Sequence, residues 1–188
     1  MECDFADCKR RERSSAILRK LVGKNIFACR SLNLDAVLMS SVGVQSILLA
    51  EDDENDVFFV ERAFKEAQIA NPLHSVRDGE QAIAYLRGDG PYADREKFPL
   101  PCLLLMDLKM PRKNGFEVIT WLRGQPGLKR LPVVIFTSSQ EDPDVNRAYE
   151  LGANSYLVKP IKFEGLVEMM RTLNLYWLMF AEKPTCRP

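Results

Sequence analysis

The sequence contains one histidine and five cysteines, and no two cysteines stand at the spacing of a metal-binding motif. An odd number of cysteines does not suit a disulfide framework, so we expect free thiols in a reducing compartment. The single histidine, His74, falls in a predicted strand, where packing or solvent contact explains it. These absences argue against zinc chemistry and favour a cytoplasmic protein.

The sequence also lacks a net charge and a long apolar run. Its 26 basic and 26 acidic side chains cancel, so we expect neither nucleic acid nor a membrane surface as a partner. The longest apolar runs fall far short of the roughly 18 residues that span a bilayer. The chain of 188 residues, 46% hydrophobic and 28% charged, suits one globular domain of ordinary size plus a tail.

From about residue 45 onward, short apolar runs alternate with segments of helical periodicity, which is typical of βαβ units. Strands are predicted at residues 46–50, 73–76, 102–106, 133–136 and 155–158. Helices are predicted at residues 55–70, 115–123 and 144–151, and two more begin near Gly79 and Phe163. Gly152 is expected to end the fourth helix. The predicted fold class is α/β, a doubly wound parallel sheet of five strands with five helices.

Residues 1–44 stand outside this alternation and include the basic cluster Lys9-Arg10-Arg11. A docking or targeting arm would explain them. A disordered tail, or a start codon set before a true start at Met39, explains them more simply, since the segment lacks the composition of a transit peptide. We therefore expect an N-terminal extension at residues 1–44 that contributes little to activity, a domain at residues 45–180 and a C-terminal tail at residues 181–188.

Polar side chains follow four of the five predicted strands. In chain order they are Glu51-Asp52-Asp53, Asp107, Thr137-Ser138 and Lys159-Pro160. The carboxyl ends of parallel strands gather at one edge of a doubly wound sheet, where ligands bind. Any one of these residues would be unremarkable at a solvated strand end, but acids, a hydroxyl and a lysine converging together indicate a site.

Carboxylates gathered in this way repel one another, at a cost of about 4 kcal/mol for an ionised pair about 4 Å apart at an effective dielectric of 20. A bound cation would remove that repulsion. Oxygen ligands without histidine or cysteine select a hard ion, and Mg²⁺ fits best. With Lys159 and Thr137 alongside, such a site would neutralise the oxygens of a transferring phosphoryl group, and Asp107 would be the nucleophile.

Over residues 46–177 the chain resembles the CheY-like receiver domains of bacterial response regulators. Four motifs in order carry the resemblance: Ile47-Leu48-Leu49-Ala50-Glu51-Asp52-Asp53, Leu104-Leu105-Met106-Asp107-Leu108-Lys109-Met110-Pro111, Val134-Ile135-Phe136-Thr137-Ser138 and Ser155-Tyr156-Leu157-Val158-Lys159-Pro160. Further segments are similar to the single-domain regulators that serve cyanobacterial phytochrome-type kinases: Asp78-Gly79-Glu80-Gln81-Ala82, Gly90-Pro91-Tyr92-Ala93, Leu151-Gly152-Ala153-Asn154-Ser155-Tyr156 and Tyr176-Trp177-Leu178.

This resemblance implies a flavodoxin-like strand order of 2-1-3-4-5 and a single-domain response regulator of a two-component phosphorelay. A histidine kinase, of phytochrome type in the narrower match, would donate a phosphoryl group to Asp107. Such a chain is a phospho-acceptor signalling protein whose only chemistry is its own phosphorylation and dephosphorylation. Its output would pass through protein contacts.

The resemblance also implies roles for individual residues. Mg²⁺ would be held by Asp52 and Asp107 directly, by Glu51 through water and by the backbone carbonyl of Lys109. Thr137 would hydrogen-bond the phosphoryl group and Lys159 would ion-pair with it, while Tyr156 would turn inward when Thr137 moves. Asp53 is then a spare charge, and the Lys159–Pro160 bond is expected to be cis.

Several alternatives stay open. An Mg²⁺-dependent phosphatase with an aspartate nucleophile is one, although the haloacid dehalogenase class expects an acid where Lys109 stands. A non-phosphorylated pseudo-receiver that only binds partners is another. The apolar cluster Tyr176-Trp177-Leu178-Met179-Phe180 can be a homodimer face in the C-terminal helix region or, in part, simply core.

Overall fold

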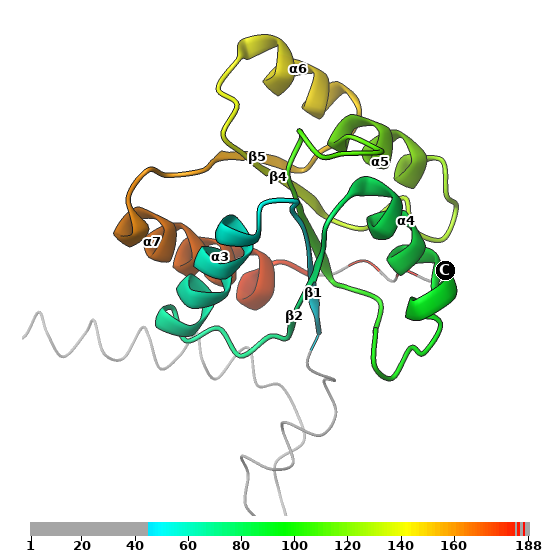
Figure 1. The fold of residues 1–188 in the computed structure, drawn as a ribbon, viewed down its shortest axis with the longest axis horizontal. Helices are drawn as coiled ribbons and strands as arrows, with labels where there is room; N and C mark the ends of the chain where they lie inside the picture. Colours follow the sequence, from blue (N-terminus) through cyan, green and yellow to red (C-terminus); the bar gives the residue numbers. More distant parts are fainter. Residues whose placement is uncertain (1–44, 183, 185, 187–188) are drawn as a thin grey trace, which may run out of the picture. The chain divides into compact units, whose positions relative to one another are not determined.

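The computed structural model describes residues 45–182, 184 and 186. The predictions made for residues 1–44 lie outside the described residues, as do positions 183, 185, 187 and 188 of the predicted tail. Within the described part, strands and helices alternate along the chain (Figure 1).

The sheet has five parallel strands in the order β2-β1-β3-β4-β5, which confirms the predicted fold and strand order. The strands are β1 (Ile47–Ala50), β2 (Leu73–Val76), β3 (Leu103–Met106), β4 (Val133–Thr137) and β5 (Ser155–Val158). Every residue of β1, β3 and β4 is buried. Strands covered on both faces read as continuous apolar runs, and this is why the sequence located them to within one residue.

Helices cover both faces of the sheet (Figure 1). The α-helices are α3 (Glu54–Glu66), α4 (Gly79–Arg87), α5 (Gly115–Arg123), α6 (Asp142–Glu150) and α7 (Phe163–Leu173). Side chains of α3 and α7 pack together on one face, and those of α4 and α5 pack on the other with Ala148 of α6. A short 3₁₀ turn (Gly90–Tyr92) follows α4, and a π-helical segment (Asn174–Phe180) follows α7.

Helix ends differ from the prediction where local signals compete. The first helix ends at Glu66 rather than at residue 70, because Gln68 takes a positive φ of 57° that stops the helix. The fourth begins at Asp142 rather than at Asp144, with Pro143 in its first turn, a position that proline favours. Gly152 has a φ of 97° directly after that helix, as predicted for a helix-ending glycine.

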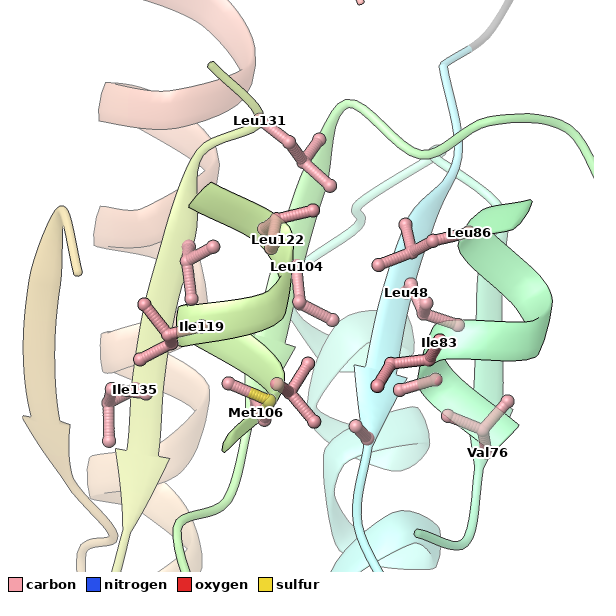
Figure 2. Close-up of a cluster of buried hydrophobic side chains, with 14 of the residues drawn as sticks. Leu48, Val76, Ile83, Leu86, Leu104, Met106, Ile119, Leu122, Leu131 and Ile135 are labelled. Atoms are coloured by element: carbon pink, nitrogen blue, oxygen red, sulfur yellow. The ribbon is translucent and has the colours of Figure 1, made fainter. Parts of the chain in front are cut away.

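The larger core cluster lies between the sheet and helices α4 and α5 (Figure 2). Leu48, Leu104 and Ile135 come from the sheet, and Ile83, Leu86, Ile119 and Leu122 meet them from the two helices. His74 packs against the rings of Tyr85 and Phe98 at the sheet's edge strand, with centroid distances of 5.7 and 6.1 Å. Burial lowers the pKa of His74.

The Lys159–Pro160 bond is trans, so the expected cis bond is wrong; trans is the lower-energy isomer of an X–Pro bond by about 0.5–1 kcal/mol. Among the described helices, none is long and apolar enough to cross a membrane.

Candidate functional site

Pairing of the central strands brings the predicted acids together at the carboxyl edge of the sheet. Ala50 of β1 pairs with Met106 of β3, so the residues that follow, Glu51 and Asp107, leave the sheet side by side. The Asp107 N–H donates to the Ala50 carbonyl at 3.0 Å. Carboxylate oxygens of Glu51, Asp52 and Asp107 lie within 4.8 Å of one another, a group that can hold a metal ion.

Asp107 is nearly buried, with 7% of its surface exposed. Its Oδ1 accepts a hydrogen bond from the Leu108 N–H at 2.7 Å, which fixes the orientation of the carboxylate. Its Oδ2 lies 3.8 Å from Lys159 Nζ. The backbone thus holds Oδ1, and Oδ2 faces the ammonium group of Lys159.

Two other acids lie closer to Lys159 than Asp107 does and hydrogen-bond to it. Its Nζ lies 2.7 Å from Glu51 Oε2 and 2.7 Å from Asp56 Oδ2. The backbone N–H of Lys159 donates to the Thr137 carbonyl at 2.8 Å, which ties the end of β5 to the end of β4. This arrangement places the predicted lysine in the acidic cluster.

Asp56 is a member of the site that the sequence reasoning missed. It lies in the first turn of α3, three residues after Asp53. Its position in that first turn, close to the strand edge, is the signal that would have indicated it. The distance of 2.7 Å to Lys159 comes from the meeting of α3 with the end of β5, which no local pattern encodes.

Burial and pairing shift the protonation of the central groups. Burial raises the pKa of Glu51 to about 7, even though the hydrogen bond from Lys159 acts in the opposite direction. Burial by itself lowers the pKa of Lys159, but the bonds to Asp56 and Glu51 outweigh it, so that pKa is raised. The site therefore contains a firmly charged lysine beside a glutamate that titrates near neutral pH.

Asp53 has a structural role. Its side chain caps α3 by accepting the Asn55 N–H at 2.7 Å, and that bond lowers the pKa of Asp53. Asp53 is therefore the N-cap of the helix that carries Asp56, and not a spare charge.

Thr137 and Tyr156 lie on the neighbouring strands β4 and β5. Thr137 is buried, and its Oγ1 accepts the Ser139 N–H at 3.4 Å. The Tyr156 hydroxyl donates to the Ser139 carbonyl at 3.1 Å, and Ser139 Oγ donates to Asp144 Oδ2 at 2.7 Å. A hydrogen-bonded chain thus leads from the site to helix α6.

Lys109 follows Asp107 in the loop to α5. It is exposed, whereas Leu108 and Met110 on either side of it are buried in the core. The two apolar anchors fix the loop backbone on both sides of Lys109.

Comparisons with known proteins match this architecture. The family described as "Response regulator receiver domain" matches residues 47–171. The response regulator Rcp1 of Synechocystis is 39% identical over 138 residues, which are 73% of this chain and 92% of Rcp1.

Solved structures give the same result. RPA3017, a response regulator in red light signaling of R. palustris, has a TM-score of 0.72 at 36% identity, covering 75% of this chain and 99% of RPA3017. The phosphorylated cyanobacterial phytochrome response regulator RcpA has a TM-score of 0.69 at 34% identity, covering 74% of this chain and 98% of RcpA. The Mn²⁺-bound form of Rcp1 has a TM-score of 0.67 at 38% identity, covering 74% and 99%. The chain belongs to the response regulator receiver domain family, whose members are signalling proteins.

Proposed function

We propose that the chain accepts a phosphoryl group on Asp107 from the phosphohistidine of a sensor kinase. The observation that carries this proposal is the setting of Asp107: a nearly buried carboxylate at the end of β3, within 4.8 Å of two further acids and 3.8 Å from Lys159. A structural carboxylate would be expected to form a closed ion pair. Asp107 instead keeps one oxygen outside hydrogen-bonding distance of the lysine.

In the proposed step, Asp107 Oδ2 forms a bond to phosphorus while the bond between phosphorus and the kinase imidazole nitrogen breaks. The electron pair of that bond stays on the imidazole, and an acyl phosphate forms. Lys159 Nζ is close enough to pair with a phosphoryl oxygen, and the Thr137 hydroxyl would donate to another. Such preorganised donors stabilise charge as it develops on the phosphoryl group.

The acidic cluster fits a hard divalent cation because its side-chain donors are all carboxylate oxygens. Glu51, Asp52, Asp107 and the backbone carbonyl of Lys109 would hold Mg²⁺, which would supply charge neutralisation for the phosphoryl oxygens when bound. The Mn²⁺-bound form of the similar Rcp1 supports a cation here.

The change that follows phosphorylation would pass through Thr137 and Tyr156. Movement of Thr137 toward the phosphoryl group would disturb its contact with Ser139, whose carbonyl binds Tyr156 and whose hydroxyl binds Asp144 of α6. A small local event can bias a two-state switch in this way. We propose that the surface formed by α6, β5 and α7 changes on phosphorylation and contacts the downstream partner.

The similarity to RPA3017 and RcpA supports a kinase of phytochrome type as the phosphoryl donor. The cysteine usage supports a cytoplasmic setting.

Homodimerisation through the C-terminal helix region is supported by the exposure of Tyr176, Met179 and Phe180, while Trp177 and Leu178 pack on the core.

Phosphoryl labelling of the full chain by acetyl phosphate with Mg²⁺ tests the proposal. The wild type should be labelled, acetate being the leaving group, and Asp107→Asn should not. Asp89→Asn, at an exposed position before the 3₁₀ turn, is the matched control and should be labelled like the wild type. Equal labelling of Asp107→Asn and the wild type would refute the assignment.

A further inference from the structure

The loop between β3 and α5 is tied to the start of α4 by an ion pair outside the acidic cluster. Arg112, in the middle of this loop, pairs with Oδ2 of Asp78. Asp78 is fully buried, and its Oδ1 caps α4 by accepting the Gln81 N–H at 2.8 Å. The loop that follows Asp107 is therefore fastened to a side chain whose own position is fixed.

The backbone at Arg112 indicates that the loop is held in place. Arg112 has a φ of 62°, in the left-handed region that residues other than glycine rarely adopt. Such a conformation persists where the surrounding structure imposes it. The bond from the Arg112 side chain to Asp78 is a restraint of this kind.

Close packing at both ends also holds the loop in place. A Cβ at Gly79 would lie 2.3 Å from the Lys113 carbonyl oxygen, so the first turn of α4 sits directly on the loop. The Gly115 N–H donates to the Leu108 carbonyl at 3.0 Å, and a Cβ at Gly115 would lie 2.7 Å from the Asp107 carbonyl oxygen. Lys109 lies inside this closed loop, so the orientation of its carbonyl depends on these ties.

We infer that Arg112 and Asp78 form a positioning pair for the cation site: their bond holds the loop so that the Lys109 carbonyl is presented beside Asp107. The inference rests on the proposed function, because it takes the acidic cluster as a cation site. Neither residue is itself a proposed ligand.

The sign of a charge effect makes the inference testable. Removing a positive charge near a cation site should strengthen cation binding if the charge acts only through space. Loss of a bond that positions the Lys109 carbonyl should instead weaken cation binding. Arg112→Gln therefore separates the two effects by direction.

The experiment is a titration of the full chain with Mn²⁺, in which the electron paramagnetic resonance signal of free Mn²⁺ reports the Kd. Arg112→Gln should raise the Kd by about tenfold, the size seen when partners of metal ligands are removed. Arg112→Lys, which keeps a cation for Asp78, should stay near the wild type. Lys113→Gln removes the positive charge of the residue next to Arg112, and it should leave the Kd unchanged or lower it.

Binding by Arg112→Gln as tight as, or tighter than, that of the wild type would overturn the inference. An equal loss in Lys113→Gln, or a loss in Arg112→Lys as large as in Arg112→Gln, would do so as well. A wild-type chain that binds no Mn²⁺ would instead overturn the proposed cation site, on which the inference depends.

Discussion

At the scale of single residues, the site gathers more acidic than basic side chains at one edge of the sheet. Lys159 is within 4 Å of Glu51, Asp56 and Asp107, and Asp52 lies beside them. Two features reduce the resulting repulsion: the shared lysine, and the raised pKa of Glu51, which lets that side chain hold a proton near neutral pH. A divalent cation at the proposed site would be a third.

Glu51 should make stability depend on pH. Its pKa rises from 4.5 to about 7 on folding, so the folded state binds the proton more tightly than the unfolded state. The stabilising contribution is fully present below pH 4.5 and is lost as pH rises through about 7; its size is on the order of 3 kcal/mol at about 1.4 kcal/mol per unit. Glu51→Gln mimics the protonated form at every pH.

Chemical denaturation without divalent cations checks this. The stability that Glu51→Gln gains over the wild type should increase steadily as pH rises from 5 to 7 and level off above pH 7. A difference between the two proteins that stays constant over this range would show that Glu51 does not titrate there.

At the scale of elements, the sequence predicted what depends on local pattern. The buried strands β1, β3 and β4 appear as uninterrupted apolar runs, and α5 was predicted over its full length, Gly115–Arg123. The end of α3 was missed because Ala67 continues the apolar spacing while the positive φ at Gln68 stops the helix. The π-helical segment Asn174–Phe180 was not separated from α7 because its apolar residues continue a helical pattern.

The packing of β3 against α4 and α5 can be tested at Leu104. This side chain is fully buried at the centre of the larger cluster (Figure 2), and its replacement by alanine leaves a cavity that rigid strands cannot close. Leu104→Ala should lower the free energy of unfolding by about 2–5 kcal/mol. Urea denaturation measures it, with Leu175→Ala, at an exposed position, as the control. A loss below about 1 kcal/mol would contradict the central place of Leu104.

At the scale of the whole molecule, all of the proposed site residues lie within residues 51–159. A chain that lacks residues 1–38 should therefore be labelled by acetyl phosphate at the same rate and to the same extent as the full chain. The time course of labelling measures this. A large loss on truncation would show that the N-terminal extension takes part in the domain.

The convergence of the site was predictable from the sequence, but its detailed contacts were not. Parallel topology alone brings Glu51, Asp107, Thr137 and Lys159 to one edge, so four strand ends sufficed to predict a site. Asp56 and the Arg112–Asp78 pair depend on how α3 meets β5 and how a loop meets α4. Such contacts join residues far apart in the sequence and leave no periodic signal.

Locating the phosphoryl group after treatment with acetyl phosphate and Mg²⁺ tests the proposed role of Asp107 most directly. Borohydride reduces an aspartyl phosphate to homoserine, which peptide mass spectrometry can assign to one position. If Asp107 is the phospho-acceptor, the wild type should carry homoserine at position 107, and Glu51, Asp52 and Asp56 should be unmodified. An unreduced Asp107, or an alcohol at one of the other three acids, would contradict it.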